Sequence, residues 1–382
     1  MIEKKLYSNK ICLLICLFIY SNLCLSQSCT PLTLDSIANP GIYNVASIAE
    51  ADGLRNGPDY SGATIYYPTN ASPPFASIVI VPGYLSLQSS IQSWGPFLAS
   101  HGIVTMTIGT NSIFENPVNR KDALFDAIMT LSQETTRGGS PLNGNLDTNK
   151  IAVGGWSMGG GGAQLAATID TSLKAVVALC PWLDSGQLTP ADLNHPVPLL
   201  IFSGELDPTA PPASHANLHY DYTPQTTNKL IYEIASGGHF VANSPTGGQE
   251  RIGKIAVSWL KKHLIGDSCY CPLLLDTPST ASVFMTNIVC PIGNTSVTDL
   301  NTESDFLYQL YPNPCTESIN LEVENTNHQT SYEIISLTGV KVSSGTLSHQ
   351  ITSIDIKNLP SGIYIMNVVR LQVSERRKFV VL

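Results

Sequence analysis

The chain carries few charged residues and no surplus of basic ones, which limits the partners that it can bind. Of its 382 residues, 13% are charged, and 29 Asp and Glu outnumber 20 Lys and Arg for a net charge of −9. Such a surface cannot neutralise a run of phosphates, so we expect no nucleic-acid partner. No compact carboxylate loop of the calcium-binding type stands out, and we expect no metal in the chemistry and no cofactor. Small, neutral or apolar partners are favoured.

The N-terminal apolar stretch is too short to span a membrane. From Ile11 to Leu25 it holds about 15 residues, whereas a membrane-spanning helix needs about 20. Basic residues precede this stretch, and Ser26 follows it. These features predict a secretory signal peptide over residues 1–26, with a membrane anchor or a lipid on Cys24 or Cys29 as the alternatives.

Cysteines are few, and some of the nine lie in the predicted signal peptide. The others can form disulfides in an oxidising compartment, namely Cys29, Cys180, Cys269, Cys271, Cys290 and Cys315. Because three of these crowd one segment, we expect a Cys271–Cys290 disulfide and a second one between Cys29 and Cys269. Cys180 lies in the apolar run "LKAVVALCPW", which is typical of a buried free thiol.

Between Ala63 and Leu264 the sequence alternates short β-rich runs with helical stretches. The predicted strands are "ATIYYP", "ASIVIVPG", "GIVTMTIG", "KIAVGG", "LKAVVAL", "VPLLIFSG" and "KLIYEIA". Strands separated by helices form a mostly parallel sheet covered on both faces, so the pattern predicts an α/β fold. Trp94 and Trp259 lie on apolar faces at helical spacing and are expected in the core.

After Cys290 the composition changes, which indicates a domain boundary. Residues 292–305 are polar and turn-rich and are predicted to be a linker, so that the first domain spans residues 29–291. Residues 306–382 contain strand-like runs such as "YEIISL" and "GIYIMNVV" without a helical period. They predict a small all-β sandwich.

The stretch "VGGWSMGGGG" places Ser157 in a G-x-S-x-G motif between a predicted strand and a predicted helix. In such an arrangement the chain turns sharply and exposes the serine Oγ. Glycine is needed on both sides of the serine because a Cβ there would collide with neighbouring backbone. We therefore expect Ser157 to be a nucleophile, and a glycine-rich turn with an incidental serine is the alternative.

A serine nucleophile needs a base, and the base needs an acid that orients it. On this scaffold the acid and then the base follow the serine along the chain. Asp207 stands where the strand in "VPLLIFSGELDPTAPP" ends and is the predicted acid, with Glu205 as a competitor. His239 stands in a glycine-flanked loop after "KLIYEIA" and is the predicted base.

The other histidines after Asp207 are assigned different roles. His215 and His219 have a helical spacing and are expected at the surface. His263 follows two lysines at the end of the last helix and is expected to be a cation that favours the helix C-terminus.

An oxyanion that forms on the attacked carbonyl needs two backbone donors. We expect these to be the N–H groups of Met158, directly after the nucleophile, and of Tyr84, after the strand in "IVIVPG". The short stretch between Trp182 and the next strand leaves no room for a cap domain, so an open cleft is expected. Tyr84, Trp156 and Trp182 are its predicted apolar walls and substrate-binding residues.

These segments together resemble the bacterial cutinase and poly(ethylene terephthalate) hydrolase family of α/β-hydrolases. The resemblance spans residues 63–290 and includes "VPGY", "GWSMGGGG", "LIFSGELDPTAP" and "GGHFVAN". It implies Ser157, Asp207 and His239 as the triad, Tyr84 and Met158 as oxyanion donors, and Trp182 as a mobile aromatic that packs on an aromatic diacid ring.

Two neighbours of the predicted triad distinguish this chain within the resemblance. Trp156 matches the polyester-hydrolase variant, since most cutinases have histidine before the serine. Phe240 follows the base as in ordinary cutinases, and no cysteine pair flanks the acid and the base. The resemblance implies ester and polyester hydrolysis.

The C-terminal runs "LYPNP", "ISLTG", "LPSGIYIMNV" and "RRKFVVL" resemble the sorting domain of type IX secretion substrates in Bacteroidota. This resemblance implies Sec export and then passage across the outer membrane by the type IX machinery, into the medium or onto the cell surface. Without it, a sandwich that binds a surface or a sugar is the alternative for residues 306–382.

The sequence therefore predicts a secreted, monomeric serine hydrolase that cleaves polyester bonds through an acyl-enzyme. A short-chain carboxylesterase or a lipase is the alternative among hydrolases, and the missing cap argues against a lid-gated lipase. A non-catalytic surface binding module is the alternative of another class. It predicts the loss of a triad member, and all three are present.

Overall fold

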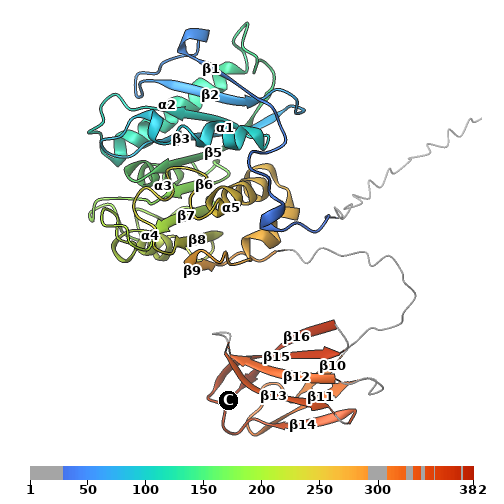
Figure 1. The fold of residues 1–382 in the computed structure, drawn as a ribbon. Helices are drawn as coiled ribbons and strands as arrows, with labels where there is room; N and C mark the ends of the chain where they lie inside the picture. The colour runs from blue at the N-terminus through green and yellow to red at the C-terminus, as the bar shows by residue number, and fades with distance from the viewer. Residues whose placement is uncertain (1–28, 291–307, 324–329, 337–339, 348, 371–372) are drawn as a thin grey trace, which may run out of the picture. The chain divides into compact units, whose positions relative to one another are not determined.

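A computed structural model describes residues 29–290, 308–323, 330–336, 340–347, 349–370 and 373–382. The predicted signal peptide over 1–26 and the predicted linker over 292–305 lie outside these residues. Internal contacts divide the chain into two compact units, Met1–Thr295 and Ser296–Leu382 (Figure 1). The domain boundaries inferred from the sequence stay predictions.

The first unit is built on one large sheet. Its strands are β1 (Val45–Ala49), β2 (Ala63–Pro68), β3 (Phe75–Val81), β4 (Val104–Ile108), β5 (Leu146–Trp156), β6 (Val176–Leu179), β7 (Leu199–Gly204), β8 (Lys229–Ile234) and β9 (Ala281–Thr286). They lie in the order β1-β2-β4-β3-β5-β6-β7-β8-β9. Neighbours from β4 to β8 are parallel, whereas β1, β2 and β9 pair antiparallel at the two edges. The predicted α/β fold is confirmed, and β1 and β9 are additions to it.

Helices cover both faces of this sheet (Figure 1). They are α1 (Trp94–Ser100), α2 (Pro117–Glu134), α3 (Met158–Ile169), α4 (Ala216–Tyr222) and α5 (Arg251–Leu260). Short helical turns complete the unit, namely η1 (Leu34–Ser36), η2 (Glu50–Asp52), η3 (Gln88–Ser90), η4 (Pro212–Ser214), η5 (Lys261–Ile265) and η6 (Ser268–Leu274). Helices α1 and α5 bury Trp94 and Trp259 in one apolar core, and α2, α3 and α4 close a second core on the other face.

The parallel strands set the position of the site. The carboxyl ends of these strands all lie on the same side of the sheet, and we call this side the carboxyl edge. The loops that follow β3, β5, β7 and β8 meet there. The connection from β6 to β7, residues 180–198, contains no helix or strand and is held by a small cluster of Leu183, Leu188 and Leu193. Among the described residues of the first unit, this connection therefore supplies no cap domain over this edge, as the sequence predicts.

The second unit consists of two antiparallel sheets. One contains β10 (Tyr308–Tyr311), β11 (Ser318–Val323) and β14 (Ile351–Asp355). The other contains β12 (Thr330–Ser336), β13 (Lys341–Leu347), β15 (Gly362–Arg370) and β16 (Val373–Val381). Residues of both sheets, including Leu321 and Met366, share one apolar core, which agrees with the predicted all-β unit.

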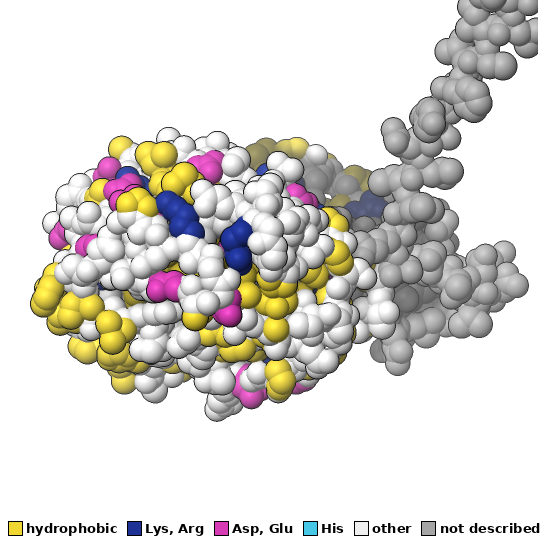
Figure 2. All heavy atoms as spheres, turned by 90° about the horizontal axis from the view of Figure 1, so that it is seen from above, with side chains coloured by type: hydrophobic (Ala, Val, Ile, Leu, Met, Phe, Trp, Pro, Cys, Tyr) yellow, Lys and Arg dark blue, Asp and Glu magenta, His cyan; other side chains and the backbone are white. Residues whose placement is uncertain are grey.

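Charged side chains are sparse on the face drawn in Figure 2. The few basic side chains there lie apart from one another, some beside acidic ones, and form no extended patch, and apolar side chains gather at one edge of the face. In the described parts of the chain no helix is long and apolar enough to cross a membrane.

One disulfide joins the N-terminal segment to the C-terminal part of the first unit, and a second lies within that C-terminal part. Cys29 is bonded to Cys269, and Cys271 is bonded to Cys290. Cys180 and Cys315 are free and buried.

The Cys29–Cys269 disulfide should contribute strongly to stability because it closes a loop of 240 residues. Cross-linking distant residues restricts the unfolded chain, so replacing both with serine should lower the free energy of unfolding by about 2–4 kcal/mol. Guanidinium denaturation without reductant measures this. The Cys271→Ser, Cys290→Ser variant, whose loop spans only 19 residues, is the comparison and should lose less. Equal losses would contradict the loop-length argument.

Candidate active site

Ser157 lies on a tight turn between β5 and α3. Its backbone has φ 57° and ψ −121°, which is unusual for a residue with a side chain. A Cβ on Gly155 would stand 2.3 Å from the carbonyl carbon of Gly159, and a Cβ on Gly159 would stand 2.4 Å from the carbonyl oxygen of Val81. The turn therefore tolerates no side chain at either glycine, and it presents the serine hydroxyl at the edge of the sheet.

Ser157, His239 and Asp207 form one hydrogen-bonded chain. The Oγ of Ser157 lies 2.9 Å from Nε2 of His239, and Nδ1 of His239 lies 2.7 Å from Oδ2 of Asp207. The side chains come from the loops after β5, β8 and β7, and all three residues are buried. The structure thus brings together the three residues that the sequence singled out.

Asp207 is held as a carboxylate. Its Oδ1 accepts hydrogen bonds from the backbone N–H groups of Thr209 and Ala210, both at 2.8 Å. Burial raises the pKa of Asp207, but the hydrogen bonds from His239, Ala210 and Thr209 outweigh it, so that its pKa lies below the usual value. An ionised Asp207 fixes the ring of His239 with Nε2 free to accept a proton from Ser157.

The competing acid points elsewhere. Glu205 is exposed, and its Oε2 accepts a hydrogen bond from the backbone N–H of Ser236 at 2.7 Å. It braces the loop that carries His239 from outside and does not contact the histidine ring.

Two of the histidine assignments are wrong. His219 is fully buried, and its Nδ1 lies 2.5 Å from Oε1 of Gln164, so it is not a surface residue. Burial and then the nearby Lys262 lower the pKa of His263 to about 3. His263 is therefore neutral at physiological pH and packs on the ring of Trp259 instead of acting as a cation. His215 is half-buried and stacks on Trp182 with ring centroids 5.7 Å apart.

Trp156 is buried and not a wall of the cleft, which corrects the prediction. Only 2% of its surface is exposed. Its Nε1 donates a hydrogen bond to the backbone carbonyl of His239 at 2.9 Å, and its ring packs on those of His239 and Phe240. Trp156 therefore stands behind the histidine and holds the loop after β8 in place.

The loop after β3 lies against the nucleophile. A Cβ on Gly83 would stand 2.8 Å from the Cβ of Ser157, so the next residue, Tyr84, begins beside the serine. On the other side, Met158 is the first residue of α3, where backbone N–H groups have no partner within the helix. Both expected donors thus flank Ser157.

Arg120 is a residue of this region that sequence patterns did not reveal. It is fully buried in α2, and its guanidinium donates hydrogen bonds to the carbonyls of Pro82 at 2.9 Å and Gly83 at 2.7 Å, and also to that of Glu115. Burial lowers the pKa of Arg120 to about 10, so it stays charged. In a trans peptide the N–H points opposite the C=O, so Arg120 turns the N–H of Tyr84 away from α2.

The two remaining predicted walls are accessible. Tyr84 is 43% exposed and meets Phe114 edge to face, with ring centroids 6.0 Å apart. Trp182 is half-buried, and its backbone N–H donates to the carbonyl of Ser157 at 2.9 Å. A cavity of about 590 Å³ adjoins Trp182 and is also lined by Leu188, His215 and Leu218.

A mostly parallel sheet with a serine on a strand–turn–helix junction, linked by hydrogen bonds to histidine and aspartate from later loops, defines the serine-hydrolase class of α/β-hydrolases. Comparison with known proteins gives the family. Residues 32–291 match the model of the PET hydrolase-like family.

Curated relatives agree with this match. The chain is 35% identical over 249 residues to bis(hydroxyethyl) terephthalate hydrolase of Streptomyces coelicolor, covering 64% of this chain and 75% of the relative. It is 35% identical over 235 residues to cutinase est1 of Thermobifida alba, covering 61% and 76%. It is 34% identical over 233 residues to cutinase cut1 of Thermobifida fusca, covering 61% and 70%. The chain belongs to the PET hydrolase-like family.

The second unit has a match of its own. Residues 309–382 match the model of the secretion system C-terminal sorting domain. The resemblance to a type IX sorting domain is confirmed, and the predicted signal peptide stays a prediction.

Four buried or half-buried histidines predict how stability changes with pH. Burial lowers the pKa of His219 and His263 to about 3 and that of His101 and His195 to about 4, from an ordinary value of 6.5. Below pH 6.5 only the unfolded chain takes up these protons, so stability is full above that pH and is lost as pH falls towards 4. Each histidine should remove up to about 1.4 kcal/mol per pH unit.

Guanidinium denaturation at pH 7, 6 and 5 measures this slope, in a range above the titration of ordinary carboxylates. The His263→Gln variant should have a shallower slope, whereas His349→Gln, at an exposed position, should leave it unchanged. A free energy of unfolding that is constant between pH 7 and pH 5 would contradict neutral histidines in the folded chain.

Proposed function

We propose that this chain is a secreted carboxylic ester hydrolase that cleaves polyesters with Ser157, His239 and Asp207 as its catalytic triad. The observation that carries the proposal is the unbroken hydrogen-bonded chain from the serine hydroxyl to a buried carboxylate, with distances of 2.9 and 2.7 Å. The family match, and the relatives named as cutinase and terephthalate-ester hydrolase, support the carboxylic ester bond as the target.

The reaction follows from these contacts. Ser157 Oγ attacks the ester carbonyl while Nε2 of His239 accepts its proton, and Asp207 stabilises the imidazolium that forms. His239 then gives the proton to the departing alcohol and leaves an acyl-enzyme. Water, deprotonated by the same histidine, attacks the acyl group and releases the acid.

The oxyanion is stabilised by the N–H groups of Met158 and Tyr84. The Met158 donor lies at the N-terminus of α3, where the helix dipole favours negative charge. The Tyr84 donor is oriented through Arg120, which binds the carbonyl of the same peptide unit. One such donor contributes about 3 kcal/mol to the stability of the transition state, roughly a hundredfold in rate.

The surroundings of the triad favour a polymer over a small soluble ester. Five large apolar side chains on the loops beside Ser157 are between 57% and 66% exposed, and we call them the apolar rim: Leu85, Leu87 and Phe114 after β3 and β4, and Leu206 and Phe240 after β7 and β8. The loops on each side are tied together, since Leu85 N–H donates to Ile113 and Leu206 N–H donates to Gly237, both at 2.8 Å. A large exposed apolar area marks a surface that binds a partner.

The alternative functions would need different structural features around the triad. A short-chain carboxylesterase would need no apolar rim outside the cleft, and a lid-gated lipase would need a cap that the connection over residues 180–198 does not supply. A binding module would not need the complete triad geometry. Export through the type IX machinery delivers the enzyme to the outside of the cell, where insoluble polyesters are met, and we propose that it acts there as a monomer.

The direct test of this function compares the full chain with its Ser157→Ala variant. Product release is measured from amorphous poly(ethylene terephthalate) film, from a film of an aliphatic polyester and from p-nitrophenyl butyrate. Because the serine is the nucleophile, the variant should lose activity on all three by about 10³-fold or more while keeping its fold.

Hydrolysis of p-nitrophenyl butyrate alone would make the protein a carboxylesterase. Hydrolysis of none of the three by the unaltered chain would overturn the enzymatic reading and favour the binding module.

The apolar rim should determine adsorption to solid polyester. In the inactive Ser157→Ala background, Leu87→Gln combined with Leu206→Gln should weaken adsorption to film about tenfold or more, since burying each leucine contributes about 1.5–3 kcal/mol. Ile169→Gln is the matched control, because Ile169 is 69% exposed at the far end of α3. Equal adsorption of the double variant and the control would contradict a binding role for the rim.

A further inference from the structure

Cys180 places a free thiol directly behind the proposed acid–base pair. It follows β6, is 1% exposed and has a φ of 44°, in the left-handed region. Its backbone N–H donates to the carbonyl of Phe202 at 2.8 Å, which fixes the residue beside β7. Neither disulfide of the first unit includes it. The hydrolytic mechanism described above does not use this thiol.

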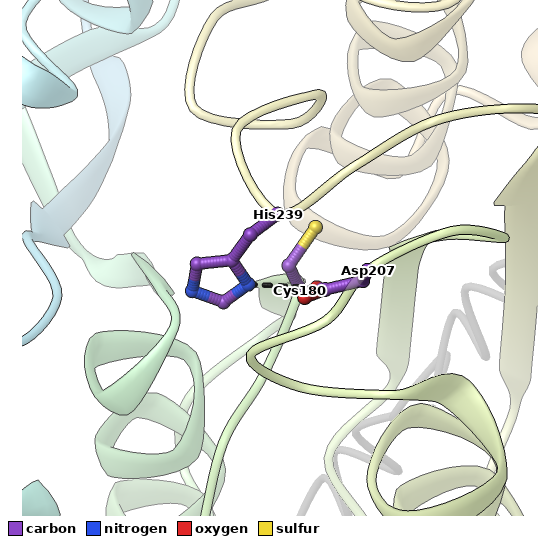
Figure 3. A group of neighbouring side chains, drawn as sticks. All are labelled: Cys180, Asp207 and His239. Atoms are coloured by element: carbon purple, nitrogen blue, oxygen red, sulfur yellow. Dashed lines mark hydrogen bonds and ion pairs between the residues drawn. The ribbon is translucent and has the colours of Figure 1, made fainter.

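The sulfur completes a set of three metal-ligand atoms. One ligand atom each from Cys180, Asp207 and His239 lie within 4.8 Å of one another (Figure 3). In this view the thiol and the aspartate carboxylate stand on the same side of the imidazole, next to the nitrogen that bonds to Asp207. Around a tetrahedral Zn²⁺ the bond lengths are about 2.0–2.3 Å, so small side-chain movements bring all three atoms onto one ion.

We propose that Cys180, Asp207 and His239 form an inhibitory site for a thiophilic divalent metal ion, of which Zn²⁺ and the softer Cd²⁺ are the representative cases. Thiolate, imidazole and carboxylate together suit such ions, whereas Mg²⁺ and Ca²⁺ prefer oxygen ligands alone. Three protein ligands leave a fourth position for water or chloride. Loss of activity on binding rests on the proposed function, but binding itself does not.

The ion inhibits by binding Nδ1 of His239, the nitrogen that faces Asp207. On binding, the metal–sulfur bond forms as the S–H bond breaks, and that proton leaves to water with no change of oxidation state. The metal also replaces the Nδ1 proton of His239, which moves to Nε2. An imidazole with its proton on Nε2 donates to Ser157 instead of accepting from it, so the serine can no longer be activated.

The burial of Cys180 distinguishes metal binding from ordinary thiol chemistry. Burial, and then the charge of Asp207, raise the pKa of the Cys180 thiol, although backbone N–H groups of Ala242 and Gly204 oppose this. An alkylating reagent needs a thiolate and space beside the sulfur, so iodoacetamide should leave the folded chain unmodified at Cys180. A metal ion without its water shell is smaller than iodoacetamide. Its bonds to Asp207 and His239 offset the free energy that it loses when it gives up its water.

The experiment titrates the full chain with Cd²⁺ in chloride buffer, with Mg²⁺ as the hard-ion control. Bound metal is counted by equilibrium dialysis and by the ultraviolet thiolate-to-cadmium band, using the Ser157→Ala variant as well as the unaltered chain. Activity on p-nitrophenyl butyrate is followed in parallel, each variant being referred to its own rate without metal. The variants are Cys180→Ala and the matched control Cys315→Ala, which removes the other buried free thiol.

One Cd²⁺ should bind per chain with a thiolate band, with inhibition that a chelator reverses and with no effect of Mg²⁺. Cys180→Ala should abolish the band and raise the half-inhibiting Cd²⁺ concentration by at least about tenfold, the smallest loss usual when a group that supports a metal site is removed. Cys315→Ala should behave like the unaltered chain.

The proposal would be overturned if Cys180→Ala and the unaltered chain were equally sensitive to Cd²⁺. It would also be overturned if the thiolate band disappeared in Cys315→Ala instead of in Cys180→Ala. Binding with the predicted band but without ester hydrolysis in any variant would support the metal site and count against the proposed function alone.

Discussion

Close backbone contact around the turn at Ser157 is what the rest of the site depends on. Strand β3, the end of β5 and the start of α3 approach so closely that Gly155 and Gly159 leave no space for a Cβ. The contact fixes the serine in an unusual conformation and brings the loop after β3 within reach of its hydroxyl. Once this corner is formed, the parallel order of β5, β6, β7 and β8 brings the loops with Asp207 and His239 to the same edge.

The loops that carry His239 and the Tyr84 donor are held from behind by side chains that make no contact with the serine hydroxyl. Trp156 bonds to the backbone of His239, Glu205 bonds to the backbone of Ser236, and Arg120 bonds to the loop after β3. Each fixes a carbonyl or an N–H of a connecting segment, where the backbone has no sheet or helix to hold it. The apolar rim lies outside these supports, so it can serve a surface without disturbing the hydrogen-bonded chain within.

Much of this arrangement could be predicted from the sequence because it depends on local patterns. The strands of the parallel sheet read as short apolar runs, and the motif around Ser157 fixes the order in which acid and base must follow. The position of Trp156, the burial of His219 and the neutral state of His263 depend on which segments pack together, which spacing along one helix does not reveal. The role of Arg120 could not be predicted for the same reason, since its partners lie about 40 residues away in the loop after β3.

The central claim is that Ser157 is the nucleophile activated by His239. Treating the full chain with a p-nitrophenyl phosphonate ester and locating the adduct by mass spectrometry of its peptides tests it most directly. The account predicts one phosphonyl group per chain, on Ser157, formed at a rate that falls sharply in His239→Ala. Labelling at another residue, or labelling of Ser157 that is equally fast without the histidine, would contradict it.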